Sequence, residues 1–291
     1  MTELPTGEGT WAAAAVGTDL YVGTYTPGDI HKVDTRTGTA TKVADVKPDP
    51  FIWCLDAAPD GKIYAGTYPR GRVVEYDPAT GQTRDFGQVV PGEQYVRSIA
   101  VDETTIYAGV GAKAHLSPST GPPAPSARSC RPNWPTAYVA SEIAGGLGTT
   151  PVEKEAQPAA FDLRTKRVRW SLVPVQGATS ISDLVARRGK LYGVADTGVL
   201  FEFDPWRRKV TRIVQVPLSA ARSGTLVETH GRLYGTDGRT IYRLDPSAMT
   251  ISTVVDGLDA QAYGTQPLLA AAPDGRALYA LRARNLVRVT L

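Results

Sequence analysis

The sequence predicts an all-β protein: a seven-bladed β-propeller of four-stranded blades. A tyrosine in a β-rich triplet recurs with a period of about 42 residues, and so does a residue that opens an acidic turn. The tyrosines are Tyr21, Tyr64, Tyr107, Tyr192, Tyr234 and Tyr279. The turn residues are Asp34, Asp77, Ser117, Asp162, Asp204 and Asp245. Since repeats of about 40 to 45 residues with four strands are typical of propeller blades, the two series indicate one repeated blade.

The turn chemistry predicts where the strands begin and end. In Asp77-Pro-Ala-Thr-Gly81 the aspartate can bond the backbone ahead, the proline presets φ, and the glycine accepts a positive φ. A second hairpin signal lies upstream in each unit, as in Ala58-Pro-Asp-Gly-Lys62. The intervening segments, such as Ser98-Ile-Ala-Val101 and Thr105-Ile-Tyr-Ala108, are apolar or alternating and lack helical periodicity. Each unit is therefore expected to hold four short strands.

The fourth unit departs from this pattern. The gap from Tyr107 to Tyr192 is two periods long, which predicts a unit without its tyrosine around Leu147-Gly-Thr-Thr150. Prolines are frequent from Pro122 to Pro135, where an outer strand should lie, and proline cannot donate to a strand ladder. Residues 117–157 are therefore either a long inserted loop or a segment altered by a local shift of the reading frame.

The two ends of the chain are expected to pair with each other. The seventh unit reaches Leu286-Val-Arg-Val-Thr-Leu291 without an outermost strand, and Met1 to Thr6 precede the first unit. Pairing of these N- and C-terminal segments would close the ring of blades, whereas an open solenoid would expose its edges. The chain is accordingly expected to form a single propeller domain over residues 1–291.

Composition narrows the classes of function. The 291 residues include 32 basic and 29 acidic side chains, a formal net charge of +3, and 42% hydrophobic residues, as in a soluble globular protein. The sequence contains no dense run of basic residues, so a nucleic-acid partner is not expected. No apolar stretch approaches the ~20 residues that span a bilayer, so a membrane partner is not expected either. The two cysteines, Cys54 and Cys130, impose no disulfide framework. A monomer is expected, extracellular if a leader was removed and otherwise cytoplasmic.

The repeats resemble the quinoprotein-like and YVTN-type β-propeller superfamily. The residues that carry the resemblance are the Pro-Asp-Gly hairpin, the Leu/Ile-Tyr-x-Gly strand and the Asp-Pro-x-Thr-Gly turn, all present between Ala57 and Gly81. The resemblance covers most of the chain outside residues 117–157 and implies architecture only, since this superfamily includes enzymes, ligand binders and scaffolds. The five tryptophans share no repeat position in this interpretation, which argues against a pyrroloquinoline-quinone docking motif. No cofactor is therefore expected.

Candidate site residues lie in loops that open on one face of the predicted propeller. These loops precede the inner strands or join the second strand of a blade to the third. The expected ligand-binding residues are Tyr25, Trp53, Arg70, Arg72, Arg97 and Lys113. Rings that stack on a sugar and guanidinium groups that neutralise a carboxylate would suit an acidic carbohydrate. The alternative is that these are ordinary solvated loops with tyrosines packed between blades.

Two classes of function remain open from the sequence. The first is a propeller that binds a small molecule, a saccharide or a protein partner without chemistry. The second is a polysaccharide lyase that acts on a uronate-containing saccharide by β-elimination, in which an arginine neutralises the carboxylate and a base takes the adjacent proton. The candidate bases are His31, His115, Tyr68 and Tyr95. No metal site is expected, because the three histidines fall in three different units.

Overall fold

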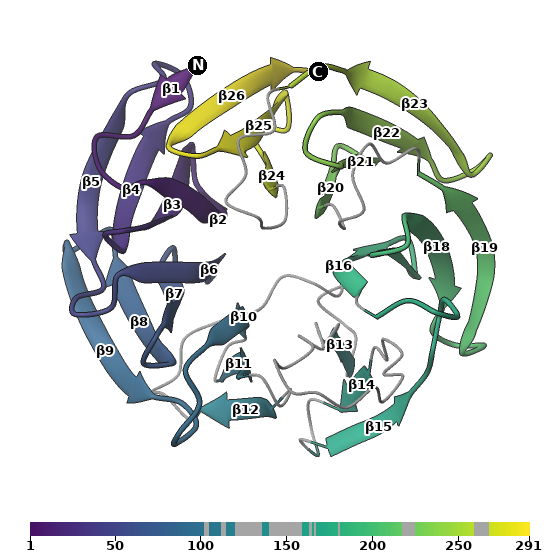
Figure 1. The fold of residues 1–291 in the computed structure, drawn as a ribbon, viewed down its shortest axis with the longest axis horizontal. Coiled ribbons are helices and arrows are strands. Elements are labelled where there is room, and N and C mark those ends of the chain that lie inside the picture. The colour runs from purple at the N-terminus through teal and green to yellow at the C-terminus, as the bar shows by residue number, and fades with distance from the viewer. Residues whose placement is uncertain are drawn as a thin grey trace. The chain divides into compact units, whose positions relative to one another are not determined.

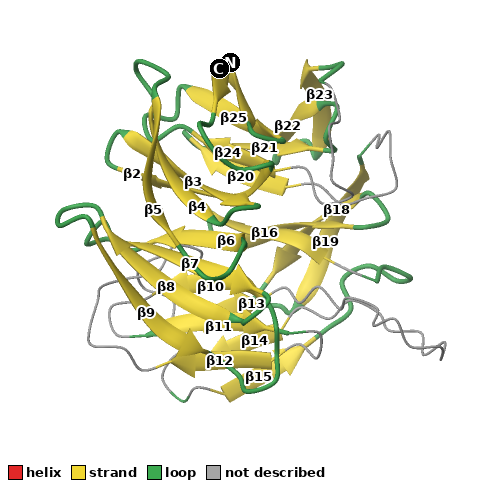
Figure 2. Cartoon of the chain, turned by 60° about the vertical axis from the view of Figure 1, so that its left-hand side comes forward, coloured by secondary structure: helices red, strands yellow, loops and turns green. Residues whose placement is uncertain are grey.

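The structure is a computed structural model that describes residues 1–101, 105–111, 115–119, 136–139, 159–162, 165, 167–179, 181–216, 225–258 and 268–291. These residues form strands and turns without a helix (Figure 2). The described part of the chain accordingly has no helix long and apolar enough to cross a bilayer. The chain divides into two compact units, residues 1–128 with 270–291 and residues 129–269. That the whole chain is a single domain stays a prediction.

The first unit contains antiparallel sheets whose strands follow one another in chain order (Figure 1). One sheet consists of β2 (Gly9–Val16), β3 (Asp19–Tyr25), β4 (Asp29–Asp34) and β5 (Ala40–Asp45). The next consists of β6 (Phe51–Ala57), β7 (Ile63–Tyr68), β8 (Arg72–Asp77) and β9 (Gln82–Gln88), and it joins the previous sheet through the single bridge between Tyr25 and Phe51. A further sheet consists of β10 (Val96–Val101), β11 (Ile106–Val110) and β12 (His115–Ser119).

The second unit repeats the same antiparallel pattern. One sheet consists of β13 (Thr136–Val139), β14 (Ala159–Asp162) and β15 (Arg167–Ser171). The next consists of β16 (Ile181–Arg187), β17 (Lys190–Ala195), β18 (Val199–Asp204) and β19 (Lys209–Gln215). The last consists of β20 (Thr225–Thr229), β21 (Arg232–Thr236), β22 (Ile241–Asp245) and β23 (Thr250–Val255). The predicted four-stranded repeat is thus present in both units.

The two ends of the chain meet in one sheet. This sheet has the order β1 (Thr2–Glu3), β26 (Asn285–Thr290), β25 (Ala277–Arg282) and β24 (Leu268–Ala271). Thr2 lies opposite Leu286, and the amide of Leu4 donates to the carbonyl of Arg284 at 2.9 Å. The first residues therefore supply the outer strand of this sheet, as the sequence predicted, and closure of a ring of blades stays a prediction.

The repeated tyrosines occupy one register position and are buried. Each lies on the second strand of its sheet, so that Tyr64 faces Glu75 and Tyr192 faces Glu202 across the neighbouring strand. Their hydroxyls donate to these carboxylates at 2.8 and 2.7 Å. The predicted equivalence of the tyrosines is confirmed. Burial of a large side chain contributes about 1.5 to 3 kcal/mol, so the series is a recurrent stabilising element.

The register corrects two details of the fourth repeat. Tyr138 faces Ala160 two residues before Asp162, just as Tyr64 faces Glu75 two residues before its acidic turn residue. The repeat tyrosine of this unit is therefore at Tyr138, and the predicted location at residues 147–150 lies outside the described residues. Ser117 does not open a turn, because it lies within β12 opposite Ala108. The two explanations for residues 117–157 concern mostly residues outside the described ranges.

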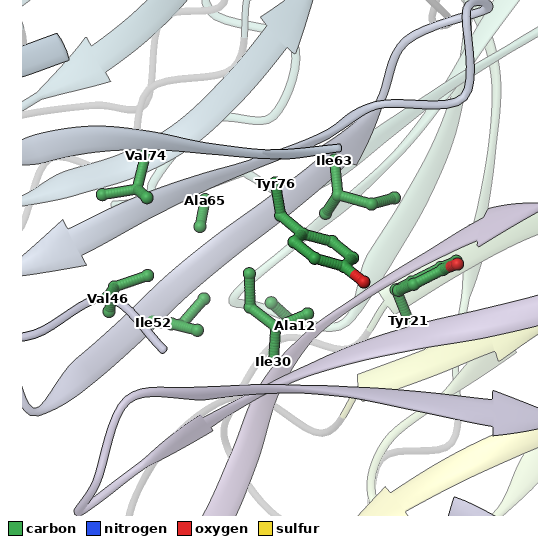
Figure 3. Packing of buried hydrophobic residues seen from close by; sticks show 9 residues of the cluster. All are labelled: Ala12, Tyr21, Ile30, Val46, Ile52, Ile63, Ala65, Val74 and Tyr76. Atoms are coloured by element: carbon green, nitrogen blue, oxygen red, sulfur yellow. The ribbon is translucent and has the colours of Figure 1, made fainter. Parts of the chain in front are cut away.

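Neighbouring sheets of the first unit pack through a continuous apolar layer (Figure 3). Its buried members are Ala12, Tyr21, Ile30, Val46, Ile52, Ile63, Ala65, Val74 and Tyr76. The approach is close at the glycine of the Tyr-x-Gly strand: a Cβ atom on Gly23 would lie 2.5 Å from Cγ2 of Ile52 on the next sheet. The small residue at this repeat position is therefore required by the packing of one sheet on another.

Candidate functional site

The inner strands of the first unit carry matching bulges. The register slips between Thr10 and Ala12 in β2, between Ile52 and Cys54 in β6, and between Val96 and Ser98 in β10. The extra residues at these slips are Trp11, Trp53 and Arg97. A bulge turns one side chain away from the regular alternation of the strand, and bulges frequently lie beside functional sites.

This register corrects one interpretation of the sequence. Trp11 and Trp53 were expected to share no repeat position, yet they occupy equivalent bulges on successive sheets. Trp11 was not among the candidates inferred from the sequence. The signal that could have identified it was its separation from Trp53 by one period of the repeat.

Six aromatic side chains gather around these bulges, and we call them the aromatic face. They come from the starts of the inner strands, from the segment before β10 and from the ends of β3 and β7. The six are Trp11, Tyr25, Phe51, Trp53, Tyr68 and Tyr95. Tyr25 is buried and the other five are partly exposed, so the face has a buried base and an accessible surface.

The rings of the aromatic face contact one another in a continuous series. Trp11 lies 4.6 Å from Tyr25, 5.5 Å from Phe51 and 4.3 Å from Trp53, measured between ring centroids. Trp53 then meets the edge of Tyr95 at 5.3 Å, and Tyr95 stacks on Tyr68 at 4.3 Å with an interplanar angle of 21°. Offset and edge-on ring pairs of this kind stabilise one another by about 0.5 to 1.5 kcal/mol. The rings are thereby held in fixed positions before any ligand arrives.

Arg97 adds a positive charge to the aromatic face. Its guanidinium carbon lies 4.6 Å from the ring centre of Tyr95 and 5.2 Å from that of Trp53, within the range of cation–π attraction. Burial and a hydrogen bond with Tyr68 raise the pKa of Tyr95, so its phenol stays protonated at neutral pH. The face therefore offers aromatic rings and one guanidinium group.

Arg70 and Arg72 have different environments, although the sequence placed them in one ligand-binding group. Arg72 is buried and donates to Asp49 at 2.8 Å, to the carbonyl of Val46 at 2.6 Å and to Asp85. The guanidinium of Arg72 is thus bonded to groups within the first unit. Arg70 has a side chain that is 61% exposed, and its Nε lies 3.7 Å from Asp49 Oδ1. Of the two, only Arg70 is placed to reach a ligand in solution.

His31 is fully buried and is bonded within the first unit. The Thr6 hydroxyl donates to Asp29 Oδ2 at 2.5 Å, so His31 Nε2 must donate to that hydroxyl at 2.9 Å. The opposite nitrogen, Nδ1, has no hydrogen-bond partner among the described residues. Burial, which outweighs the attraction of Asp29, lowers the pKa of His31 to about 4. The imidazole is therefore neutral at neutral pH and lies away from solvent.

The remaining candidates cannot be placed as side chains. His115 lies in β12 opposite Val110, but its side chain is outside what the structure describes. Lys113 also lies outside the described residues. Within the described ranges, no three His, Cys, Asp or Glu side chains are arranged to hold a metal ion.

Comparisons with known proteins bear on the fold. No family model and no curated protein matches the sequence. Among solved structures, a chain of a mitotic checkpoint complex matches with a TM-score of 0.74 and 11% identity, over 99% of this chain and 90% of that one. A catalytically inactive variant of virginiamycin B lyase from Staphylococcus aureus, determined with quinupristin, matches with a TM-score of 0.73 and 12% identity, over 99% and 97% of the two chains.

Hydrazine synthase from Kuenenia stuttgartiensis also matches, with a TM-score of 0.69 and 13% identity over 99% of this chain and 97% of that one. The neighbours have different activities, and at this identity the likeness concerns the fold alone. The virginiamycin B lyase neighbours are β-propellers, so this chain has a propeller-type fold, as its repeats predicted. A function must be argued from the aromatic face itself.

Proposed function

We propose that this protein is a ligand-binding β-propeller that holds an acidic saccharide on the aromatic face. The observation that carries the proposal is the repeated bulge, which presents Trp11, Trp53 and Arg97 from three successive sheets. A pyranose ring stacks its C–H face on an indole or phenol ring, and a guanidinium binds a carboxylate through two parallel hydrogen bonds. The rings and Arg97 together match both parts of a uronate sugar.

The position of Arg97 selects the charge of the ligand. Partly exposed aromatic rings can also bind organic cations, but here a guanidinium already lies over Trp53 and Tyr95. A second cation would be repelled at this distance, whereas an anion would be attracted. A carboxylate-bearing sugar is therefore favoured over a quaternary ammonium ligand or a methylated lysine.

The same observations favour binding over lyase chemistry. Of the candidate bases, His31 is buried away from solvent and the pKa of Tyr95 is raised, which makes each a poor acceptor of a substrate proton. The lyase alternative predicts that incubation with polygalacturonate produces the ultraviolet absorbance of an unsaturated uronate. A rise in that absorbance, lost on His115→Ala, would replace the binding proposal with the enzymatic one.

The binding proposal is tested by titration with trigalacturonate, followed by tryptophan fluorescence and calorimetry. We expect Arg97→Ala to weaken binding at least tenfold, and Arg97→Lys to bind more weakly than the original protein, because an ammonium cannot reproduce the planar fork. Arg36→Ala is the control, since Arg36 is an exposed arginine of the same unit that lies in the turn after β4 and not at a strand bulge. Undiminished binding by both Arg97 variants would move the site elsewhere.

We also propose that the antiparallel sheets are the blades of a seven-bladed ring closed by β1 and β26. The described residues form seven meanders of three or four strands, once the sheet bridged by Tyr25 and Phe51 is divided into its two parts, and these support the count. In such a ring, the starts of the inner strands line a central mouth, where the aromatic face would lie. An experimental structure with six or eight blades would contradict the proposal.

A further inference from the structure

One acidic turn of the repeat differs from its equivalents. In four of these turns, an aspartate accepts the amide of the residue two positions ahead: Asp34 from Arg36, Asp77 from Ala79, Asp204 from Trp206 and Asp245 from Ser247. The third residue is small or charged in three of them. In the turn between β18 and β19 it is Trp206, whose side chain is among the large apolar groups exposed to solvent, at 77%. The turn geometry does not require a tryptophan.

The fifth residue of these turns adopts a positive φ. Gly38 and Gly81 tolerate this conformation without strain, whereas Arg208, with a φ of 51°, and Met249, with a φ of 55°, are not glycines. A residue other than glycine is disfavoured in this conformation by about 1 kcal/mol. Met249 is buried in a hydrophobic cluster, so packing accounts for its side chain, whereas Arg208 is exposed and core packing does not account for it.

The side chains around Trp206 form a basic and aromatic surface, which we call the Trp206 surface. Arg207 is 79% exposed, and Arg208 and Lys209 are also exposed. The guanidinium of Arg208 lies 5.7 Å from the ring centre of Trp170, on β15 of the same unit. The nearby carboxylate of Asp204 is already bonded by Lys190 at 2.5 Å. Arg207 also pairs with Asp204, at 3.9 Å, so the residues named here comprise four cations, Lys190 included, and one carboxylate.

We propose that the Trp206 surface is a second binding site for an acidic polysaccharide, distinct from the aromatic face. Trp206 would stack on one sugar ring, and Arg207, Arg208 and Lys209 would neutralise carboxylates of neighbouring units along the polymer. A single exposed ring suits one sugar but offers too little apolar area for insertion into a membrane, since Pro205 beside it is buried. The class of ligand rests on the proposed function, whereas the location of the surface does not.

The test measures binding of long-chain polygalacturonate, with dextran as the neutral polymer. We expect Trp206→Ala to weaken binding at least fivefold. Arg208→Gly should weaken it at least threefold while the melting temperature stays the same or rises, because glycine relieves the positive φ. Arg36→Ala, in an equivalent turn without an aromatic residue, and Ile213→Ala, an exposed apolar residue on β19, are matched controls that should bind normally.

Each result decides between specific alternatives. Normal binding by Trp206→Ala and Arg208→Gly overturns the proposal, as does equal retention on dextran or failure of the original protein to bind polygalacturonate. Binding to phosphatidylserine vesicles or to single-stranded DNA that is stronger than binding to polygalacturonate also overturns it. Loss of binding in Arg97→Ala alone supports only the aromatic face, and loss in the Trp206 variants alone supports the Trp206 surface and contradicts the proposed function.

Discussion

The two units have the same strand bulge with different residues in it. In the first unit, the extra residues of β6 and β10 are Trp53 and Arg97, and they contribute to a partly exposed set of rings. In the second unit, β16 has the same slip, between Ile181 and Asp183, but Ser182 is the extra residue. The buried carboxylate of Asp183 beside it accepts the amide of Leu226 at 2.9 Å on the next sheet. The extra residue thus differs between the units, whereas the residue after it bonds the next sheet in both: Cys54 Sγ donates to the carbonyl of Val96, and Asp183 accepts the amide of Leu226.

The units also contain buried ionisable groups with opposite responses to pH. His31 in the first unit has a lowered pKa because burial disfavours its charged form. Asp183 in the second unit has a raised pKa for the same reason, although two backbone amides partly offset the effect. One physical cause therefore makes one unit sensitive to acid and makes the other less stable at neutral pH.

The largest effect is expected from removal of residues 1–8 from the first unit. This truncation removes β1, the buried Leu4 side chain and the bond from Thr6 to Asp29. We expect a loss on the order of 5 kcal/mol and a fall in melting temperature of about 10 °C or more, measured by thermal denaturation. Glu3→Ala, which removes only an exposed ion pair with Arg284, should change little. An unchanged melting curve for the truncated protein would mean that β1 does not stabilise its sheet.

A smaller loss of unfolding free energy is expected when the buried guanidinium of Arg72 is removed. Arg72→Leu leaves the carboxylate of Asp49 buried without its main partner, which costs about 3 to 5 kcal/mol of unfolding free energy. The matched variant Arg70→Ala should change stability by less than about 0.5 kcal/mol, because Arg70 is exposed. Urea denaturation measures both, and equal losses would contradict the assignment of Arg72 to the fold.

Acid is expected to destabilise the first unit through His31. Its pKa is about 4 in the folded state and near 6.5 in the unfolded state, so the unfolded state binds a proton between these values. Stability is fully present above pH 6.5 and falls as the pH is lowered toward 4, by on the order of 2 kcal/mol. His31→Asn should flatten this part of the pH profile of unfolding free energy. A profile that keeps its slope in the variant would assign the acid sensitivity to other groups.

Asp183 is expected to make the stability of the second unit depend on pH in the opposite direction. Its pKa is about 6 when folded and 3.8 when unfolded, so the folded state holds a proton that the unfolded state releases. This contribution to stability is full below pH 3.8 and is lost as the pH rises to 6. We expect Asp183→Asn to be less destabilising at pH 7 than at pH 4, as measured by urea denaturation at both values. The opposite order would contradict the raised pKa.

The smallest expected effect is that of Arg70 on ligand binding. Arg70 lies two residues after Tyr68 of the aromatic face, but its side chain is exposed and forms an ion pair with Asp49. Screening by solvent limits such contacts, so Arg70→Ala should weaken trigalacturonate binding by only about two- to threefold in calorimetry. A tenfold loss, equal to that expected for Arg97→Ala, would show that both arginines bind the carboxylate directly.

The sequence predicts the repeat better than it predicts the site. The turns and the repeated tyrosines are recognised from residues close in sequence, so the strands could be inferred. The position of residues 1–6 as the outer strand of the last sheet could be inferred from the same repeat. The environment of Arg72 could not, because Asp49 lies before β6 and reaches Arg72 only through tertiary packing. Trp11 was omitted because a bulge reverses the alternation from which the orientation of a strand residue is judged. Tyr138 was omitted because the proline-rich segment displaces the period.

The pairing of Thr2 with Leu286 also has a consequence for the order of folding. After β1 has been synthesised, its partner becomes available only when residues 285–290 have followed it. The second unit, by contrast, is continuous over residues 129–269 and can complete its sheets earlier. Because contacts between distant residues form slowly, we expect the sheet of β1 and β26 to be the last element acquired during biosynthesis. Until then, Leu4 would remain an apolar side chain that chaperones can recognise.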